Sequence, residues 1–134
     1  MKLELKHLAP YLPYGLEVKH TIINKHSKII GIEFTHELRI RLSNGLYAYY
    51  DKILLPILRP FSDLKYKSTS ELKSKYNIND DIIFWIQELT EKNIEIKYLT
   101  VETYNFLLQH HFDIFGLIDK GLAISIHDVE QVIA

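Results

Sequence analysis

The chain has 134 residues, of which 47% are apolar and 25% are charged, and its formal net charge is −1. This composition is that of an ordinary globular protein and excludes bulk disorder. The lack of cysteine excludes a disulfide scaffold, a thiolate zinc site and a cysteine nucleophile. Because this length is typical of one domain, we expect a single domain over residues 1–134.

The apolar stretches of the chain indicate where the protein resides. No apolar run approaches the ~20 residues that a membrane span needs, and the longest, residues 53–58, contains Pro56. The first residues alternate charged residues with leucine and lack the apolar core of an export signal. We therefore expect a cytoplasmic protein that makes no membrane contact.

Charge is distributed unevenly between the two halves of the chain. Residues 1–75 contain 13 Lys/Arg and 7 Asp/Glu, a net +6, whereas residues 76–134 contain 3 and 10, a net −7. A basic half can bind nucleic acid, but oppositely charged halves can also pack on each other or be solvated. We favour the second explanation because the charges are dispersed among apolar residues, and nucleic-acid binding by the basic half is kept as an alternative.

The first half of the chain predicts an antiparallel β-meander over residues 16–50. Residues 5–9 can form one helical turn, after which Pro10 and Pro13 predict a non-regular segment up to Gly15. Alternating apolar residues then predict four strands: 16–22, 29–34, 38–42 and 46–50. Asn44-Gly45 supplies the positive φ angles of a tight hairpin turn between the last two strands.

The second half predicts helices and two short strands. Residues 53–60 are apolar but contain two prolines, so we expect an extended crossing at a sheet edge. Helical spacing and capping residues predict several helices, which begin at Ser62, Ser70, Asp80, Thr100 and Asp113, the first two of them short. Gly121 is expected to end the last of these helices in a left-handed conformation, and a terminal helical turn is expected from Asp128. Alternation predicts strands at 94–98 and 122–126. The order of elements predicts an α+β fold, with the meander packed against C-terminal helices and two short strands.

The densest group of possible metal ligands is His110-His111-Phe112-Asp113. Adjacent residues on a helix point about 100° apart, so His110 and His111 cannot both face one metal ion. We place both histidines near a helix C-terminus and expect Asp113 to cap the next helix. No metal site is predicted, and no cofactor either, because the chain lacks glycine-rich phosphate loops.

Glu95-Ile96-Lys97 forms an acidic–x–lysine pattern on a predicted strand, with Asp80 and Asp81 upstream. In metal-dependent nucleases a carboxylate holds Mg²⁺ while a lysine orients the attacking water. The sequence has five such triplets, whereas chance alone gives roughly two, so the pattern carries little information. A metal-dependent nuclease is a further alternative, and no catalytic residue is assigned.

Tyrosines follow Asn44-Gly45 on the second strand of the predicted hairpin. We predict that Tyr47 lies opposite Leu42 and Tyr49 opposite Ile40, which places both tyrosines on the core face. Tyr50 would then lie on the other face with the arginines of the partner strand. A stacking platform for single-stranded nucleic acid needs two or more exposed rings, so this pattern favours core packing.

Three stretches of the chain are distinctive: residues 7–16 (HLAPYLPYGL), 56–64 (PILRPFSDL) and 111–124, which contain HFD and GLIDKGLAI. In these stretches the chain resembles a family of small uncharacterised proteins encoded in Bacteroidota genomes, often in prophage-like or mobile regions. The resemblance implies a bacterial or phage cytoplasmic setting and an accessory role. It implies no catalytic or ligand residue.

The proline-, tyrosine- and arginine-rich segments either stiffen loops over a small core or present a contact surface. Because the chain contains no catalytic motif, we favour a non-enzymatic protein-interaction or adaptor module that binds another protein. The candidate binding residues are Tyr11, Tyr14, Arg39, Arg41, Tyr50 and Arg59.

Overall fold

A computed structural model describes most of the chain. The described residues are 3–21, 25–34, 38–45, 47–48, 54–65 and 67–133. The fold is α+β, as predicted, with antiparallel strands in the first part of the chain and helices in the second. Among the described residues, no helix has the length and apolar character needed to cross a membrane.

The chain starts with a short α-helix, α1 (Leu5–Leu8), that continues into a 3₁₀-helix, η1 (Ala9–Tyr14). The prediction of a non-regular segment after residue 9 is wrong. The fixed φ of proline lies within the 3₁₀ range, and Pro10 stands in the first turn, where no N–H donor is needed. Gly15 ends η1 with a left-handed φ of 65°.

Within the described residues, six strands form one mixed sheet. The strands are β1 (Glu17–His20), β2 (Lys25–Phe34), β3 (Leu38–Leu42), β4 (Tyr47–Ala48), β5 (Leu54–Leu58) and β6 (Ile124–Ser125). Their spatial order is β4-β3-β2-β1-β5-β6, with β5 and β6 parallel and all other pairs antiparallel. The predicted meander and the short strand near residue 124 are confirmed.

The β3–β4 hairpin has a register one residue away from the predicted one. Arg41 pairs with Tyr47, and Ile40 pairs with Ala48. The turn explains the shift, because the Gly45 N–H donates to the Leu42 carbonyl at 3.0 Å and Gly45 has a φ of 86°. This is a three-residue loop closed by a left-handed glycine rather than the expected two-residue Asn-Gly turn. The predictions for Tyr49 and Tyr50 lie outside the described residues.

The prediction that the proline-containing strand lies at a sheet edge is also wrong. β5 lies between β1 and β6, with Pro56 opposite Val18 of β1. β6 pairs only with Ile57 and Leu58, which follow the proline. Pro56 is therefore tolerated in an inner strand because its missing N–H falls outside the β6 ladder.

The helices after β5 are η2 (Phe61–Asp63), α2 (Thr69–Tyr76), α3 (Asp80–Lys92), η3 (Ile96–Tyr98), α4 (Val101–Gln109) and α5 (Ile126–Ile133). Thr100 caps α4, as predicted, by accepting from the Thr103 N–H. α3 is capped by Asn79, whose side chain accepts from the Ile82 N–H at 3.0 Å, rather than by Asp80. Asp80 is the first helical residue of α3 instead.

Two further predicted elements differ from the structure. The predicted strand at 94–98 is absent from the described residues, where residues 96–98 form η3 and residues 94 and 95 have no regular secondary structure. Residues 113–120 form turns rather than a helix, since Gly116 adopts a left-handed φ of 67°. Gly121 is left-handed, as predicted, with a φ of 73°.

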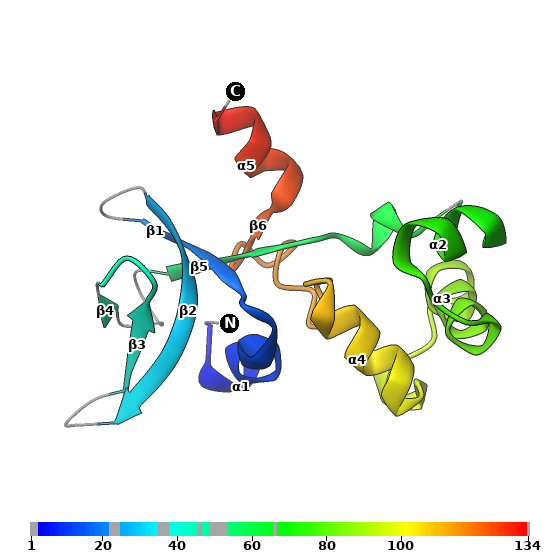
Figure 1. Cartoon of the computed structure of the whole chain (residues 1–134), viewed down its shortest axis with the longest axis horizontal. Coiled ribbons are helices and arrows are strands. Elements are labelled where there is room, and N and C mark those ends of the chain that lie inside the picture. Colours follow the sequence, from blue (N-terminus) through cyan, green and yellow to red (C-terminus); the bar gives the residue numbers. More distant parts are fainter. Residues whose placement is uncertain are drawn as a thin grey trace.

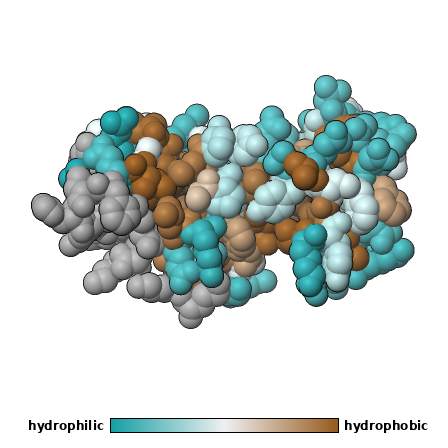
Figure 2. All heavy atoms as spheres, turned by 90° about the horizontal axis from the view of Figure 1, so that it is seen from below, coloured by the Kyte–Doolittle hydropathy of each residue, from teal (hydrophilic) through white to brown (hydrophobic). Residues whose placement is uncertain are grey.

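The sheet lies at one end of the molecule and α2, α3 and α4 lie at the other, with β5 leading from one to the other (Figure 1). Buried apolar residues from both ends belong to one core cluster, including Val18 and Ile40 of the sheet and Ile86 and Leu107 of the helices. Figure 2 shows hydrophobic residues running through the middle of the molecule. The core thus joins the sheet and the helices.

Candidate functional site

The three distinctive stretches of the sequence meet at one junction in the fold. Tyr11 of η1 is fully buried, and its hydroxyl donates to the Phe112 carbonyl at 2.5 Å. The same hydroxyl accepts from the Ile114 N–H at 3.1 Å. Burial raises the pKa of Tyr11 well above its usual range. Its hydroxyl therefore stays a donor at neutral pH, which the Phe112 carbonyl requires.

The main chain of Arg59 is fixed by the segment that follows α4. Its N–H donates to the His111 carbonyl at 2.8 Å, and its carbonyl accepts from the Asp113 N–H at 2.9 Å. Arg59 and Phe112 thereby form an isolated parallel bridge. The start of the Arg59 side chain is consequently held in place by backbone hydrogen bonds, independently of any side-chain contact.

His111 fastens the same segment to η1. Its Nε2 lies 2.7 Å from the Tyr14 carbonyl, and because a carbonyl only accepts, this nitrogen carries the proton. His111 also has a left-handed φ of 61°, a conformation that is strained by about 1 kcal/mol or more for a residue with a side chain. Such strain persists where the surroundings over-determine it, and it is concentrated at functional sites.

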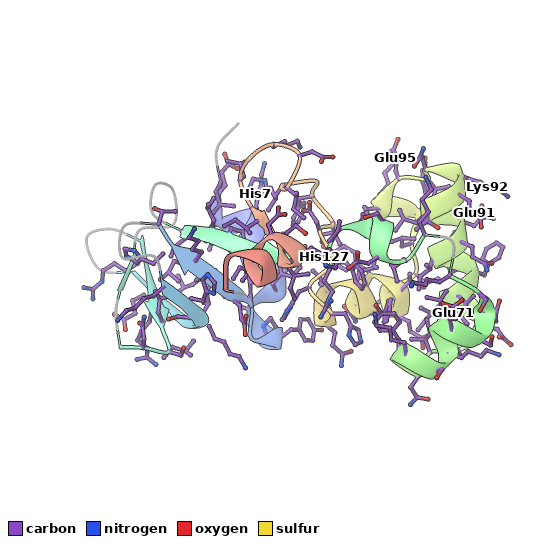
Figure 3. The ribbon with its side chains drawn as sticks, turned by 90° about the horizontal axis from the view of Figure 1, so that it is seen from above. His7, Glu71, Glu91, Lys92, Glu95 and His127 are labelled. Carbon is purple, nitrogen blue, oxygen red and sulfur yellow. The ribbon has the colours of Figure 1, made fainter. Side chains whose placement is uncertain are left out.

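A surface hollow of about 230 Å³ lies beside these bonds. It is lined by residues from η1, β1, β2, β5 and the start of α5: Tyr14, Gly15, Glu17, Lys28, Ile57, Arg59, His111 and Ile126. The start of α5 is anchored by His127, whose Nε2 lies 2.7 Å from the Asp63 carboxylate and which is labelled in Figure 3. The hollow brings together Tyr14 and Arg59, two of the residues that the sequence analysis selected.

Lys28 and Arg59 supply positive charge to the hollow. Among the described residues, neither side chain forms an ion pair. The field of Arg59 is evident at His110, whose pKa is lowered first by burial and then by the neighbouring positive charge of Arg59. Glu17 is the one carboxylate among the lining residues, so with neutral histidine the lining carries a formal +1. This excess favours an anionic ligand.

The sheet positions Lys28 next to η1. Lys28 is the cross-strand partner of Glu17. Its carbonyl accepts from the Ser43 N–H at 2.9 Å, and its N–H donates to the Ser43 hydroxyl at 3.1 Å. The aliphatic stem of Lys28 passes over Gly15, since a Cβ built there would lie 3.8 Å from Lys28 Cδ. The two cations of the hollow are thus placed by different elements, β2 and the end of β5.

The other predicted binding residues are placed elsewhere. Tyr11 cannot be a surface contact, because its ring is fully buried in the core. Arg39 and Arg41 on β3 both contact the Glu33 carboxylate, at 3.0 Å and 3.7 Å. Neither arginine lines the hollow. Tyr50 lies outside the described residues.

The acidic–x–lysine pattern does not form a compact site. Glu95 and Lys97 pair with each other at 3.2 Å and both are exposed. Asp80 stands at the other end of α3, and a helix of 13 residues is about 20 Å long. Figure 3 shows Glu95 with Glu91 and Lys92 at the helical end of the molecule. Among the described residues, no three His, Asp or Glu side chains are arranged to hold a metal ion.

Two larger hollows lie at the helical end of the molecule. One, of about 510 Å³, is lined only by residues between Lys67 and Tyr76, so it is the face of a single helix. The other, of about 590 Å³, lies between α2 and α4 and has Glu102 as its charged lining residue. Neither of these hollows brings together cations placed by two strands of the sheet, which distinguishes the smaller hollow at the junction.

Sequence reasoning missed Lys28, Glu17 and His111 as members of one site. Lys28 and Glu17 occupy ordinary alternating strand positions, and His111 was assigned to the end of a helix. The one signal in the sequence was that Tyr14, Arg59 and His111 each lie in one of the three distinctive stretches; Lys28 and Glu17 lie outside them. Comparisons of the chain with protein-family models, curated proteins and solved structures found no match.

Proposed function

We propose that the chain is a non-enzymatic protein-interaction module that binds an anionic group of a partner protein in the hollow of Lys28, Arg59 and His111. One observation carries the proposal: two cations without ion-pair partners in the described part of the chain line a hollow built from separate segments. The hollow measures about 230 Å³, below the ~300–1,000 Å³ of usual small-molecule sites. It therefore suits one terminal or side-chain group of a larger partner.

The rigidity of the junction supports this role. Arg59 is held by two backbone hydrogen bonds to residues 111 and 113, and the His111 ring is fixed by the Tyr14 carbonyl. A site whose groups are already in place loses less conformational entropy on binding, which favours affinity. From the sequence resemblance we also propose a bacterial or prophage origin, a cytoplasmic location and an accessory role.

Nucleic-acid binding is a weaker candidate for this chain. Both arginines of β3 contact Glu33, so the basic half presents fewer available cations than its composition indicates. The acidic second half, with a net charge of −7, repels phosphates that come within about one Debye length of it, roughly 8 Å at physiological salt. A protein partner that inserts one anionic group meets a smaller penalty than a nucleic acid, because it brings fewer negative charges.

Selection from random peptides displayed on phage, with both free and internal chain ends, tests the proposed function. Enriched peptides are synthesised and their affinity is measured by fluorescence anisotropy. We expect Arg59→Gln to weaken binding about 10- to 100-fold, the loss of a charge-assisted hydrogen bond. The matched control Arg39→Gln should change affinity by less than about twofold, because Arg39 contacts Glu33.

The opposite results would reject the proposal. Failure to enrich any peptide, or equal effects of Arg59→Gln and Arg39→Gln, removes the hollow as a protein-binding site. Duplex and single-stranded DNA are measured in parallel at 50 and 200 mM salt. Sub-micromolar DNA binding at the higher salt that is lost in Arg59→Gln would assign the same cations to nucleic acid instead.

A further inference from the structure

The lining of the hollow combines charged and aliphatic side chains. Lys28 and Arg59 can receive an anion, while Ile57 and Ile126 add apolar surface from β5 and from the start of α5. Ile57 is only 4% exposed and so forms part of the floor of the hollow, whereas Ile126 is half-buried and offers most of the apolar contact surface. A ligand that fits must therefore carry one negative charge and an aliphatic group close to it.

We infer that the hollow binds the carboxyl terminus of a partner chain whose last residue is aliphatic, an inference that rests on the proposed function. A terminal residue carries its α-carboxylate and its side chain on the same carbon. The carboxylate can meet Arg59 in the bidentate geometry that guanidinium groups favour, while the side chain contacts Ile57 and Ile126. The side chain of Asp or Glu ends in its carboxylate and offers no apolar group beyond it.

The size of the hollow supports a chain end. Its volume of about 230 Å³ is below the ~300–1,000 Å³ of usual small-molecule sites, so it suits a single terminal residue rather than a longer segment. An internal acidic residue would have to bring main chain on both sides into or across the same space. A chain end enters from one side only.

The charge of the lining supports a monoanion. Lys28 and Arg59 are opposed by Glu17, the cross-strand partner of Lys28, so the formal excess is +1. A carboxylate neutralises this excess, whereas a phosphate monoester, which carries ≈ −1.5 to −2 at neutral pH, would leave the occupied hollow with a net negative charge beside Glu17. Capture of a terminal carboxylate is an established mode by which small domains recognise peptides.

The test titrates the ¹⁵N-labelled full chain at constant ionic strength with four probes and follows its amide signals by NMR. The probes are N-acetyl-leucine, N-acetyl-leucinamide, N-acetyl-glutamic acid α-amide and inorganic phosphate. We expect N-acetyl-leucine to give saturable shifts at Gly15, Lys28 and Arg59, with at least tenfold weaker binding of the other three probes. Arg59→Gln should weaken N-acetyl-leucine binding at least tenfold, and Arg39→Gln should leave it unchanged.

Each contrary outcome overturns the inference in a distinct way. Equal binding of N-acetyl-leucine and its amide shows that the carboxylate is not recognised. Tighter binding of the glutamic acid probe assigns the hollow to acidic side chains, and tighter phosphate binding assigns it to phosphate. The proposed function survives these results if display-selected peptides still depend on Arg59, and it fails if no peptide is selected. Lys28→Gln serves as a second variant should Arg59→Gln not fold.

Discussion

Arg39 and Arg41 on β3 and Arg59 at the end of β5 carry the same charge in different surroundings. Glu33 is the cross-strand partner of Arg39, and both β3 arginines reach its carboxylate. The residues paired with β5 are Val18, Lys19 and His20 of β1 and Ile124 and Ser125 of β6, none of which is a carboxylate. The main chain of Arg59 pairs with residues 111 and 113. The availability of a cation is therefore decided by whether its side chain reaches a carboxylate, rather than by the local density of basic residues. Lys28 illustrates this, because Glu17 is its cross-strand partner but forms no ion pair with it in the described part of the chain.

The regions around Arg59 and Arg39 also differ in the kind of contact that stabilises them. Around Arg59 the junction consists of buried hydrogen bonds between segments about 100 residues apart, such as the bond from Tyr11 to Phe112. Around Arg39 the contacts are ion pairs whose side chains are each about one-third exposed. Buried hydrogen bonds are costly to break, whereas exposed ion pairs contribute little. Substitutions in the two regions should therefore differ in effect.

Tyr11→Phe is expected to have the largest effect on stability. The substitution keeps the ring but removes two buried hydrogen bonds, so that the Phe112 carbonyl and the Ile114 N–H retain only their bond to each other at 2.9 Å. At about 0.5–1.5 kcal/mol for each hydrogen bond, the free energy of unfolding should fall by about 1–3 kcal/mol. Urea denaturation measures this, with Tyr98→Phe as the exposed control. A loss below about 0.5 kcal/mol would show that the junction is not held by these bonds.

Gly15→Ala should have the next largest effect. Gly15 has a φ of 65°, and the nearest atom to an added Cβ, Lys28 Cδ, is 3.8 Å away, so the penalty is backbone strain rather than a clash. We expect a loss of about 1–2 kcal/mol in the free energy of unfolding. Gly31→Ala is the matched control, since Gly31 has no positive φ and an added Cβ meets only Arg41 Nε at 3.9 Å. Equal losses in the two variants would contradict the role assigned to Gly15.

Stability should fall on acidification from pH 7 to pH 5.5. The pKa of His7 is lowered by burial and by Lys6, and the pKa of His110 is lowered by burial and by Arg59. A histidine with a lowered folded-state pKa contributes stability that is complete above its unfolded value of about 6.5 and is lost as the pH falls below that value. Protonation would also remove the His7 Nδ1 acceptor of the Glu4 N–H bond at 2.9 Å.

Urea denaturation at several pH values measures this dependence. His110→Gln should flatten the pH profile between 7 and 5.5, because one of the two titrating groups is removed. Burial raises the pKa of Asp113, an effect of opposite sign that belongs to the carboxyl range at lower pH. Constant or rising stability between pH 7 and 5.5 would contradict the assignment to the two histidines.

Glu33→Gln should have the smallest effect on stability and a distinct effect on binding. The ion pairs of β3 contribute about 0.2–1 kcal/mol each, so the free energy of unfolding should change by less than about 1 kcal/mol. Removing the carboxylate takes away the ion pair of Arg41, whose guanidinium can then contact a phosphate. The log–log salt slope of single-stranded DNA binding should then steepen by about 0.7 for each new contact. An unchanged slope would show that Glu33 does not control this arginine.

Local patterns in the sequence predict much of this fold. Alternation of apolar residues marks the meander, Thr100 marks the start of α4, and Gly121 marks a left-handed position. Each of these signals depends on a few neighbouring residues. The hairpin register was missed by one residue because Asn44-Gly45 fits two turn types, and only the Gly45-to-Leu42 hydrogen bond distinguishes them.

The candidate site could not be predicted in the same way. Its centre depends on the pairing of Arg59 with residues 111 and 113, a contact between distant segments that no local pattern encodes. Arginine count alone pointed equally to Arg39, Arg41 and Arg59. The three arginines can be distinguished only in the structure, where Glu33 lies opposite Arg39 in the β2–β3 ladder and, within the described part of the chain, contacts both β3 arginines but not Arg59.

The most direct test of the account is an acetate titration that observes the arginine side chains. Chloride is exchanged for acetate at constant ionic strength, and the ¹⁵N-labelled Nε–Hε signals of Arg39, Arg41 and Arg59 are followed by NMR. The account predicts a saturable shift of Arg59 that is reduced in Lys28→Gln, with small linear shifts of Arg39 and Arg41. Equal shifts of all three signals, or an unchanged Arg59 signal, would contradict the claim that Glu33 occupies Arg39 and Arg41 while the Lys28–Arg59 hollow is the anion site.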